Sequence, residues 1–471
     1  MHEFDDTIAA IATAPGAAGL AVLRVSGARA LEIADGVFHG RGTLAAAAGH
    51  TLHHGWAVWP GAAGSAENPA GPIVDEVVAA LFRAPHSYTR EDVVELSCHG
   101  GALNAARLLD ALIAAGARLA RPGEFTLRAF LSGRLDLAQA EAVADLIHAE
   151  TESARELALS QLSGALSGRL ATIEERLADA AAEVEARVDF AEDVGGIEVP
   201  AHVVEAVSDV DASLAALLDG SDWSRAIREG ARVPLVGRPN AGKSSLFNAL
   251  LGQERAIVTQ LPGTTRDRVS EAIEIAGVRV TLSDTAGLRD PSDEIEAIGV
   301  ERTHAAIADC RVALWVVDGS TAPAEADRTI ARALEGKRVL VALNKCDLPR
   351  AARLDSLESW RSAEPRRVVA VSATQGSGID SLRDALAELI GAGIGDAGGL
   401  ALAASNPRHI EALGRARAAL ARARDVASAG APGEIVALEL RDALGAIGEV
   451  TGRGVGDDLL DRIFSRFCIG K

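Results

Sequence analysis

A glycine-rich segment near the middle of the chain carries residues suited to holding phosphate groups. It begins at Gly237, ends at Ser244 and matches the pattern G-x-x-x-x-G-K-S. In such a loop the backbone N–H groups wrap the phosphates, and the dipole of the following helix favours anions. Lys243 would reach the β- and γ-phosphates, and the Ser244 hydroxyl would hold Mg²⁺. A strand-like run precedes the motif and a helical run follows it, which is the context that the motif requires.

Three further motifs follow in the order expected of a guanine nucleotide site. Residues 284–287 read D-T-A-G, in which the carboxylate can orient the magnesium shell and the glycine N–H can sense the γ-phosphate. Residues 344–347 read N-K-C-D, and this Asp can accept from N1–H and the 2-amino group of guanine, a donor pair that adenine lacks. Residues 372–373 would support the base, and a Thr of the segment 263–267 can close onto Mg²⁺. The combination predicts a GTPase domain.

The residue that orients the attacking water is not identified by these motifs. Ras-like proteins carry Gln directly after D-x-x-G, whereas this chain has Leu288, which cannot orient water. A hydrolytic residue must therefore come from elsewhere, and the acidic segment 290–301 offers four candidates. They are Asp293, Glu294, Glu296 and Glu301. A solvated charged loop is the alternative interpretation of each.

Apolar runs alternate with helical patterns around these motifs. The strand-like runs are 233–236, 278–282, 312–317, 339–343 and 368–371. This alternation is typical of a parallel, doubly wound sheet. Helical patterns flank the α/β segment, from about residue 129 and again after a Gly-rich linker at 391–399. Insertion of the α/β unit into one helical domain is the simplest explanation.

The first 120 residues or so are predicted to form a mixed α/β region. Its β-rich runs are 8–12, 20–25, 77–82 and 93–97. A Gly/Pro/Ala-rich stretch at 61–72 is expected to be a loop, and 104–115 a helix. Farther along, Asp136 and Gln139 have the spacing of a capping box at the start of a helix.

Composition limits the class of protein. A length of 471 residues suggests about three domains, and 48% hydrophobic with 24% charged residues is globular composition. The net charge of −19 argues against a protein that coats nucleic acid non-specifically. Four widely spaced cysteines favour a reducing cytosol, and neither a membrane span nor a secretory signal is expected. The last four residues resemble a prenylation box only superficially.

Several further segments resemble the MnmE (TrmE) family of tRNA-modification GTPases. They are residues 6–13, 23–27, 84–95, 98–101, 121–126, 135–142 and 461–471. The match runs the length of the chain, and R-P-G-E-F and the terminal F-C-I-G-K are its specific parts. The resemblance implies a multidomain chain with an N-terminal α/β folate-binding and dimerisation domain at 1–120. It also implies an all-α helical domain in two parts, 121–228 and 393–471, with a Ras-like P-loop α/β GTPase domain inserted at 229–392.

The resemblance also implies an activity and partners. GTP hydrolysis would serve the modification of the tRNA wobble uridine U34 at carbon 5, which gains a (carboxymethyl)aminomethyl group. The partner would be MnmG, an FAD protein, in a heterotetramer or larger complex. The one-carbon unit would come from 5-formyl- or methylene-tetrahydrofolate, and glycine or ammonium would supply the nitrogen. The chain would be a cytoplasmic homodimer whose GTPase domains also dimerise, dependent on K⁺.

The family's nucleotide and metal residues map onto this sequence one by one. The implied GTP-binding residues are Asn240, Ala241, Gly242, Lys243, Ser244, Ser245, Thr259, Gln260, Leu261, Pro262, Gly263, Thr264, Thr265, Asp284, Thr285, Ala286, Gly287, Asn344, Lys345, Asp347, Ser372 and Ala373. The Mg²⁺ ligands map to Ser244 and Thr265. The K⁺ ligands map to Asn240, Thr259, the Leu261 carbonyl and Thr264. The water-orienting glutamate maps to Glu296, one of the four acidic candidates.

The family's folate contacts map to the N-terminal region and the last residue. They are Arg24, Glu95, Arg134 and Lys471, with Arg134 where relatives carry Lys. A carboxylate suits the amide and amino edge of a pterin, and cations suit the glutamate tail. Without the resemblance, Arg24 and Glu95 would be interpreted as a surface ion pair. Cys468 falls near the one-carbon site in the family pattern, and His99 is interpreted as structural.

Two other functions compete with this interpretation. One is a regulatory or ribosome-associated GTPase whose N-terminal domain serves only for dimerisation. The other is a folate-dependent, methyltransferase-like enzyme with a regulatory GTPase domain. The folate-contact residues disfavour the first of these. The acidic net charge favours delivery of tRNA in a complex with a more basic partner.

Overall fold

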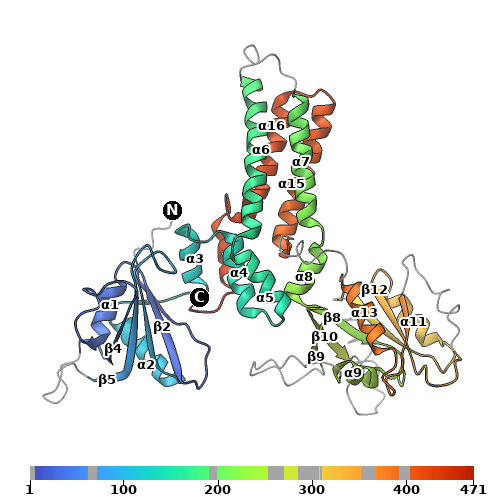
Figure 1. Cartoon of the computed structure of the whole chain (residues 1–471), viewed down its shortest axis with the longest axis horizontal. Helices are drawn as coiled ribbons and strands as arrows, with labels where there is room; N and C mark the ends of the chain where they lie inside the picture. Colours follow the sequence, from blue (N-terminus) through green and yellow to red (C-terminus); the bar gives the residue numbers. More distant parts are fainter. Residues whose placement is uncertain are drawn as a thin grey trace. The chain divides into compact units, whose positions relative to one another are not determined.

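The computed structural model describes residues 6–61, 72–189, 199–252, 270–284, 307, 310–351, 367–391 and 404–470 (Figure 1). The chain divides into two compact units, Met1–Ala144 with Gly448–Lys471, and Asp145–Ile447. The first unit therefore contains both ends of the chain. The domain boundaries expected at 120, 228 and 392 stay predictions. Among the described residues, no helix is long and apolar enough to cross a membrane.

The first unit is built on a seven-stranded sheet with the order β3-β4-β5-β6-β2-β1-β7. Its strands are β1 (Ile8–Ile11), β2 (Leu20–Ser26), β3 (Phe38–Gly40), β4 (Thr51–Val58), β5 (Ile73–Phe82), β6 (Val93–His99) and β7 (Arg118–Leu119). All pairs are antiparallel except β1 with β7. The four predicted β-rich runs are confirmed as β1, β2, β5 and β6. Residues 62–71 of the expected loop lie outside the described residues.

The helices α1 (Ala30–Val37) and α2 (Ala102–Ala114, the predicted helix) cover one face of this sheet, and α3 (Glu124–Leu131) packs Phe125 against Ile8 and Ala10 at one end of the other face. The helices α1 and α2 share a core with buried strand residues such as Leu23 and Leu96. Alternate strand residues point to the other face, where Arg24, Glu95, Ala80 and Leu52 lie side by side across four strands. Leu52 is 72% exposed and Trp56, four residues along β4, is 42% exposed. We call this face, away from the part that α3 covers at β1, the open face of the sheet.

The C-terminal end of the chain returns to this unit and packs against it. The elements involved are α3 (Glu124–Leu131), α4 (Leu137–His148) and α17 (Asp457–Phe464). Leu137, Phe464 and Phe467 share a small apolar core. Gly123 has φ +66°, and a Cβ there would lie 2.6 Å from the Phe464 carbonyl oxygen, so only glycine fits this turn. The predicted capping box is confirmed, since Asp136 and Gln139 exchange side chain-to-backbone hydrogen bonds.

The second unit contains a bundle of long helices. They are α5 (Glu152–Leu162), α6 (Ala165–Asp189), α7 (Ala201–Leu218), α8 (Ser221–Glu229), α15 (Pro407–Ser428) and α16 (Gly433–Thr451, which ends in the first unit). Figure 1 shows α6, α7, α15 and α16 running alongside one another. Gln161 donates to Ser405 Oγ at 2.9 Å, and Arg417 pairs with Asp211 at 2.7 Å. The helical segments before and after the α/β region therefore pack together.

The second unit also contains a six-stranded sheet with the order β13-β12-β11-β8-β10-β9. Its strands are β8 (Ala231–Val236), β9 (Ser270–Ile275), β10 (Val278–Asp284), β11 (Val312–Asp318), β12 (Arg338–Asn344) and β13 (Arg367–Ala370). The five predicted runs are confirmed as parallel strands. The sheet is not wholly parallel as expected, because β9 pairs antiparallel with β10 through a tight turn at 276–277. The helices are α9 (Lys243–Leu251), α11 (Glu325–Ala333) and α13 (Ile379–Ile390).

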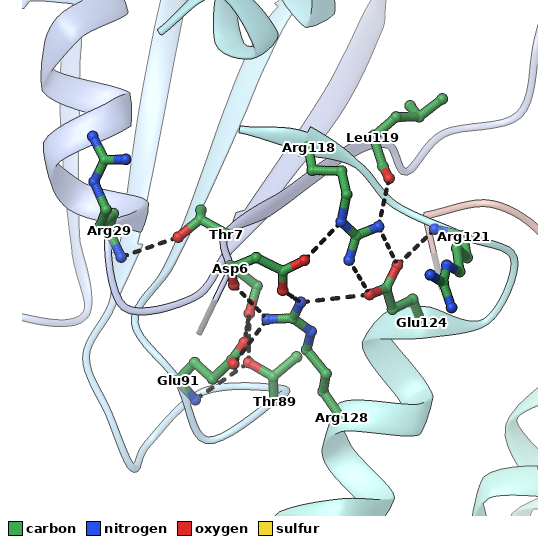
Figure 2. A network of polar contacts seen from close by, with 11 residues as sticks. Asp6, Thr7, Arg29, Thr89, Glu91, Arg118, Leu119, Arg121, Glu124 and Arg128 are labelled. Atoms are coloured by element: carbon green, nitrogen blue, oxygen red, sulfur yellow. Dashed lines mark hydrogen bonds and ion pairs between the residues drawn. The ribbon is translucent and has the colours of Figure 1, made fainter. Parts of the chain in front are cut away.

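A buried network of charged side chains joins separate parts of the first unit (Figure 2). Arg128 on α3, only 2% exposed, pairs with Asp6 at 2.6 Å, Glu91 at 2.9 Å and Glu124 at 3.4 Å. Arg118 on β7 also pairs with Asp6 and Glu124. Burial alone would raise the pKa of Glu124, but the hydrogen bonds and charges of Arg118, the Arg121 N–H and Arg128 hold it below its ordinary value. The Glu124 carboxylate therefore remains ionised at neutral pH.

We expect Arg128→Met to destabilise the first unit strongly. The substitution keeps side-chain length but leaves three carboxylates without their shared cation, which typically costs about 3–5 kcal/mol in a buried network. Amide hydrogen exchange of peptides from β1 and α3 in the whole chain should become at least about a hundredfold faster. Arg29→Met, which removes an exposed pair with Glu32, should leave exchange unchanged. Equal behaviour of the two variants would contradict the role of the network.

Candidate functional site

The glycine-rich loop lies between β8 and α9, as its motif predicts. Gly242 has φ +91°, and a Cβ there would collide with the amide of Asn344. A Cβ on Gly237 would likewise collide with the carbonyl of Val316 on the neighbouring strand β11. Both positions therefore require glycine. The Lys243 ammonium is buried inside the loop and donates to the carbonyls of Gly237 and Arg238 at 2.8 and 2.9 Å.

Asn344 brings three of the predicted nucleotide motifs together. It ends β12, is 2% exposed, and its amide nitrogen donates to the Ala241 carbonyl of the glycine-rich loop at 2.9 Å. Its amide oxygen accepts from the backbone N–H of Ala373 at 3.1 Å. Lys345 follows with φ +64° and pairs with Asp318 at 2.7 Å. One buried side chain thus ties the phosphate loop to both segments predicted to bind the base.

A contact that sequence reasoning missed anchors the start of the glycine-rich loop. The Arg238 Nε lies 3.0 Å from an oxygen of Asp327, which is fully buried on α11. Arg238 also donates to the Thr321 hydroxyl at 2.8 Å. In the motif Arg238 is one of the unspecified positions, and nothing in the sequence marks Asp327 as its partner. The pair ties the loop to the segment that follows β11.

Much of the predicted metal and hydrolytic machinery lies outside the described residues. This holds for Thr259, Gln260, Leu261, Pro262, Gly263, Thr264, Thr265, Thr285, Ala286, Gly287, Glu296 and Lys471. The roles of the described ones stay predictions, and the structure gives their positions. Asp284 ends β10, Ser244 and Ser245 lie in the first turn of α9, and Asn240 is exposed in the loop with φ +62°. Asp347 lies exposed in the turn after β12, and Ser372 is buried beside Ala373.

A second candidate site is a cavity of about 550 Å³ in the first unit. Its lining residues are Phe82, Pro85, His86, Ser87, Tyr88, Arg90, Val93, Glu95 and Arg134. Two of the four residues predicted to contact folate are in this set. Arg24 joins them because its guanidinium pairs with Glu95 at 2.7 Å, between neighbouring positions of β2 and β6. The structure therefore brings together the three predicted folate contacts that it describes.

Tyr88 holds two of these guanidinium groups. Arg24 lies 5.1 Å and Arg134 4.7 Å from the centre of its ring, and Arg134 also donates to the Tyr88 carbonyl at 2.7 Å. The Tyr88 hydroxyl is 2.9 Å from the hydroxyl of Thr126 on α3, which fixes the ring. Arg24 and Glu95 do form an ion pair, but one that is only 14% and 26% exposed. Sequence reasoning did not single out Tyr88, although it is the chain's one tyrosine.

The remaining described candidates in the first unit are Cys468 and His99. Cys468 is exposed, and its carbonyl accepts from the Gly123 N–H at 3.4 Å. Gly470, two residues after Cys468, packs against the backbone at Ile11. Ile11 ends β1, which pairs with β2, the strand that carries Arg24. His99 is held by Asp75, whose hydrogen bond and charge raise the pKa of the imidazole. Its role as a structural residue stays a prediction.

We expect Asn344→Ala to weaken nucleotide binding. Loss of the amide leaves the Ala241 carbonyl and the Ala373 N–H without partners, at a cost of about 1–3 kcal/mol, and lets the two loops separate. The dissociation constant for a fluorescent GDP analogue should therefore rise about tenfold to a hundredfold. Cys346→Ser changes an exposed side chain in the same turn, and its dissociation constant should stay within about twofold of the wild-type value. An unchanged affinity in Asn344→Ala would contradict the bridging role.

Comparison with known proteins identifies the family. One family model, described as the MnmE helical domain, matches residues 137–468, and another, described as GTP-binding protein TrmE N-terminus, matches residues 7–134. The chain is 46% identical to the tRNA modification GTPase MnmE of Symbiobacterium thermophilum, over 99% of this chain and all of that one. It is 45% identical to that of Chloroflexus aurantiacus, with the same coverage. Among solved structures it is similar to the G domain of the T. maritima FeoB iron transporter, at 25% identity over 34% of this chain and 98% of that one, with a TM-score of 0.26. On the two family models and the full-length identity, the chain belongs to the MnmE family of tRNA modification GTPases.

Proposed function

We propose that this GTPase hydrolyses GTP to drive modification of the tRNA wobble uridine at carbon 5, with a one-carbon unit carried by tetrahydrofolate. The observation that carries the proposal is the cavity of the first unit, which lies beside the Arg24–Glu95 pair and is lined by Arg134. A GTPase that only regulates would not need a cavity of this size and charge. The product would be a (carboxymethyl)aminomethyl group on U34, made together with MnmG.

The polar groups of the cavity suit a folate. Arg24 occupies one oxygen of Glu95, and the other oxygen has no partner among the described residues. That oxygen can accept from the amide and amino edge of a pterin, which offers two adjacent donors. Arg134 would bind the carboxylate tail, since a guanidinium matches a carboxylate with two parallel hydrogen bonds. Lys471 and Cys468, from the segment that returns to β1, would complete the site.

In the nucleotide site, the described residues fit a nucleotide with its cations. Ser244 and Thr265 would hold Mg²⁺, and the Asn240 side chain would supply an oxygen to K⁺ with Thr259, Leu261 and Thr264. The cations would neutralise charge that develops on the phosphates during hydrolysis. Glu296 would orient the attacking water, a role that Leu288 cannot fill. The guanine base would be recognised by Asp347, three residues after the buried Asn344, whose amide donates to the glycine-rich loop.

The open face of the first sheet supports a homodimer. Leu52 and Trp56 project from β4 on the face opposite α1 and α2, and both are exposed. Exposed apolar side chains that gather on one face commonly mark an interface. The same face carries Arg24 and Glu95, so a second copy seated on it would border the folate cavity. Because each chain has a net charge of −19, the dimer would act on tRNA in the cytoplasm together with a more basic partner.

The modification can be tested directly on tRNA. In cells that lack this chain, mass spectrometry should show loss of the 5-aminomethyl-type wobble uridines. Wild type should restore them, and Glu296→Ala should not, because water is no longer oriented for attack on GTP. Arg24→Met and Glu95→Gln should also fail, while the purified variants hydrolyse GTP at the normal rate. Unchanged nucleosides in the deletion would refute the proposal.

The dimer can be tested with one charged substitution and its control. Leu52→Arg places a cation at the centre of the open face and should convert the dimer to a monomer, because an unpaired charge is costly in an apolar interface. Sedimentation velocity would report the change in mass. Leu103 on α2 is similarly exposed, at 69%, but lies on the helical side of the sheet, so Leu103→Arg should remain dimeric. Dimerisation of Leu52→Arg would exclude this face as the interface.

A further inference from the structure

Two guanidinium groups at the cavity of the first unit have no carboxylate partner among the described residues. Arg134 donates to the carbonyl of Tyr88 at 2.7 Å, and Arg90 donates to the carbonyl of Ser132 at 2.9 Å. The third guanidinium, on Arg24, is neutralised by Glu95. The cavity therefore keeps two uncompensated positive charges, both on exposed side chains. Such a surplus favours a ligand with more than one negative charge.

Arg90 occupies an unusual backbone position. Its φ is +64°, a left-handed conformation that glycine adopts without strain and arginine does not. The conformation places the guanidinium against the turn 132–134, where Gly133 would bring a Cβ to 3.8 Å from an Arg90 nitrogen. Arg90 thus reaches the turn that carries Arg134. The two free cations line the same cavity from the loop before β6 and from the end of α3.

We propose that Arg90 is a specificity-determining residue that selects folates whose tail carries several carboxylates. This inference rests on the proposed use of tetrahydrofolate. Arg90 offers only donors, so it cannot recognise the amide and amino edge of the pterin, which needs the acceptor on Glu95. It can bind carboxylates beyond the first, which Arg134 holds. A monoglutamate tail offers Arg90 one carboxylate beside the one that Arg134 holds, whereas a γ-linked chain of glutamates supplies several, one after another.

The size of the preference follows from the exposure of the cations. Guanidinium–carboxylate pairs open to water are weak and screened by salt, typically below about 1 kcal/mol each. The triglutamate form should therefore bind about threefold to tenfold more tightly than the monoglutamate form at low salt. The difference should shrink towards unity at about 0.5 M salt, where the screening length falls to a few ångströms.

Arg90→Gly tests the inference without endangering the fold. Glycine accepts φ +64° without strain, so the loop should keep its conformation and the melting temperature should not fall. Isothermal titration of the full-length chain would give dissociation constants for mono- and triglutamyl 5-formyltetrahydrofolate. Arg90→Gly should bind the monoglutamate within twofold of wild type and lose the preference for the triglutamate. Arg107→Gln, an equal change of charge on α2, should keep that preference.

The outcomes separate this inference from the function on which it rests. Equal affinity of wild type for the two forms would overturn the role of Arg90 but leave folate binding intact. An equal loss of affinity for both forms in Arg90→Gly would also overturn the role of Arg90 and leave folate binding intact. If neither form binds to wild type, the proposed use of folate fails and the inference fails with it.

Discussion

The buried guanidinium of Arg128 is the interaction on which the first unit depends. A charge that is 2% exposed must be compensated, and Asp6, Glu91 and Glu124 converge on it from three segments. Asp6 precedes β1, Glu91 lies in the loop before β6, and Glu124 begins α3. Satisfying one cation therefore sets the positions of a strand, a loop and a helix at once.

The network also positions the residues that line the candidate folate cavity. Glu91 also accepts from the Ser26 hydroxyl, so the loop 84–92 is tied to β2 as well as to α3. Tyr88 lies in this loop, and its hydroxyl forms a hydrogen bond with the hydroxyl of Thr126 on α3. The guanidinium groups of Arg24 and Arg134 pack against its ring. The cations that would meet a ligand are thus held by packing and hydrogen bonds, which lowers the cost of ordering them on binding.

In the nucleotide site, too, a buried polar side chain is satisfied by segments that are distant in sequence. Asn344 is buried, and its two polar atoms are satisfied by the glycine-rich loop and by the segment at Ala373. Arg238 and the buried Asp327 add a second tie between that loop and α11. In both units a buried polar group is compensated by segments distant in sequence, and each tie joins the elements that carry a candidate site.

The sequence alone was sufficient to predict the order of the nucleotide motifs and the strands that precede them. It also predicted the capping box at Asp136 and the family. These features depend on residue type and on spacing within a few positions, which local chemistry and periodicity decide. Only the tertiary structure showed that Arg128 pairs with Asp6, 122 positions away, that Tyr88 supports two arginines, and that the final glycine packs on β1. Only the structure also showed that the edge strand β9 pairs antiparallel with β10. Such contacts join distant segments, and which partner compensates a buried charge is decided by the fold that brings them together.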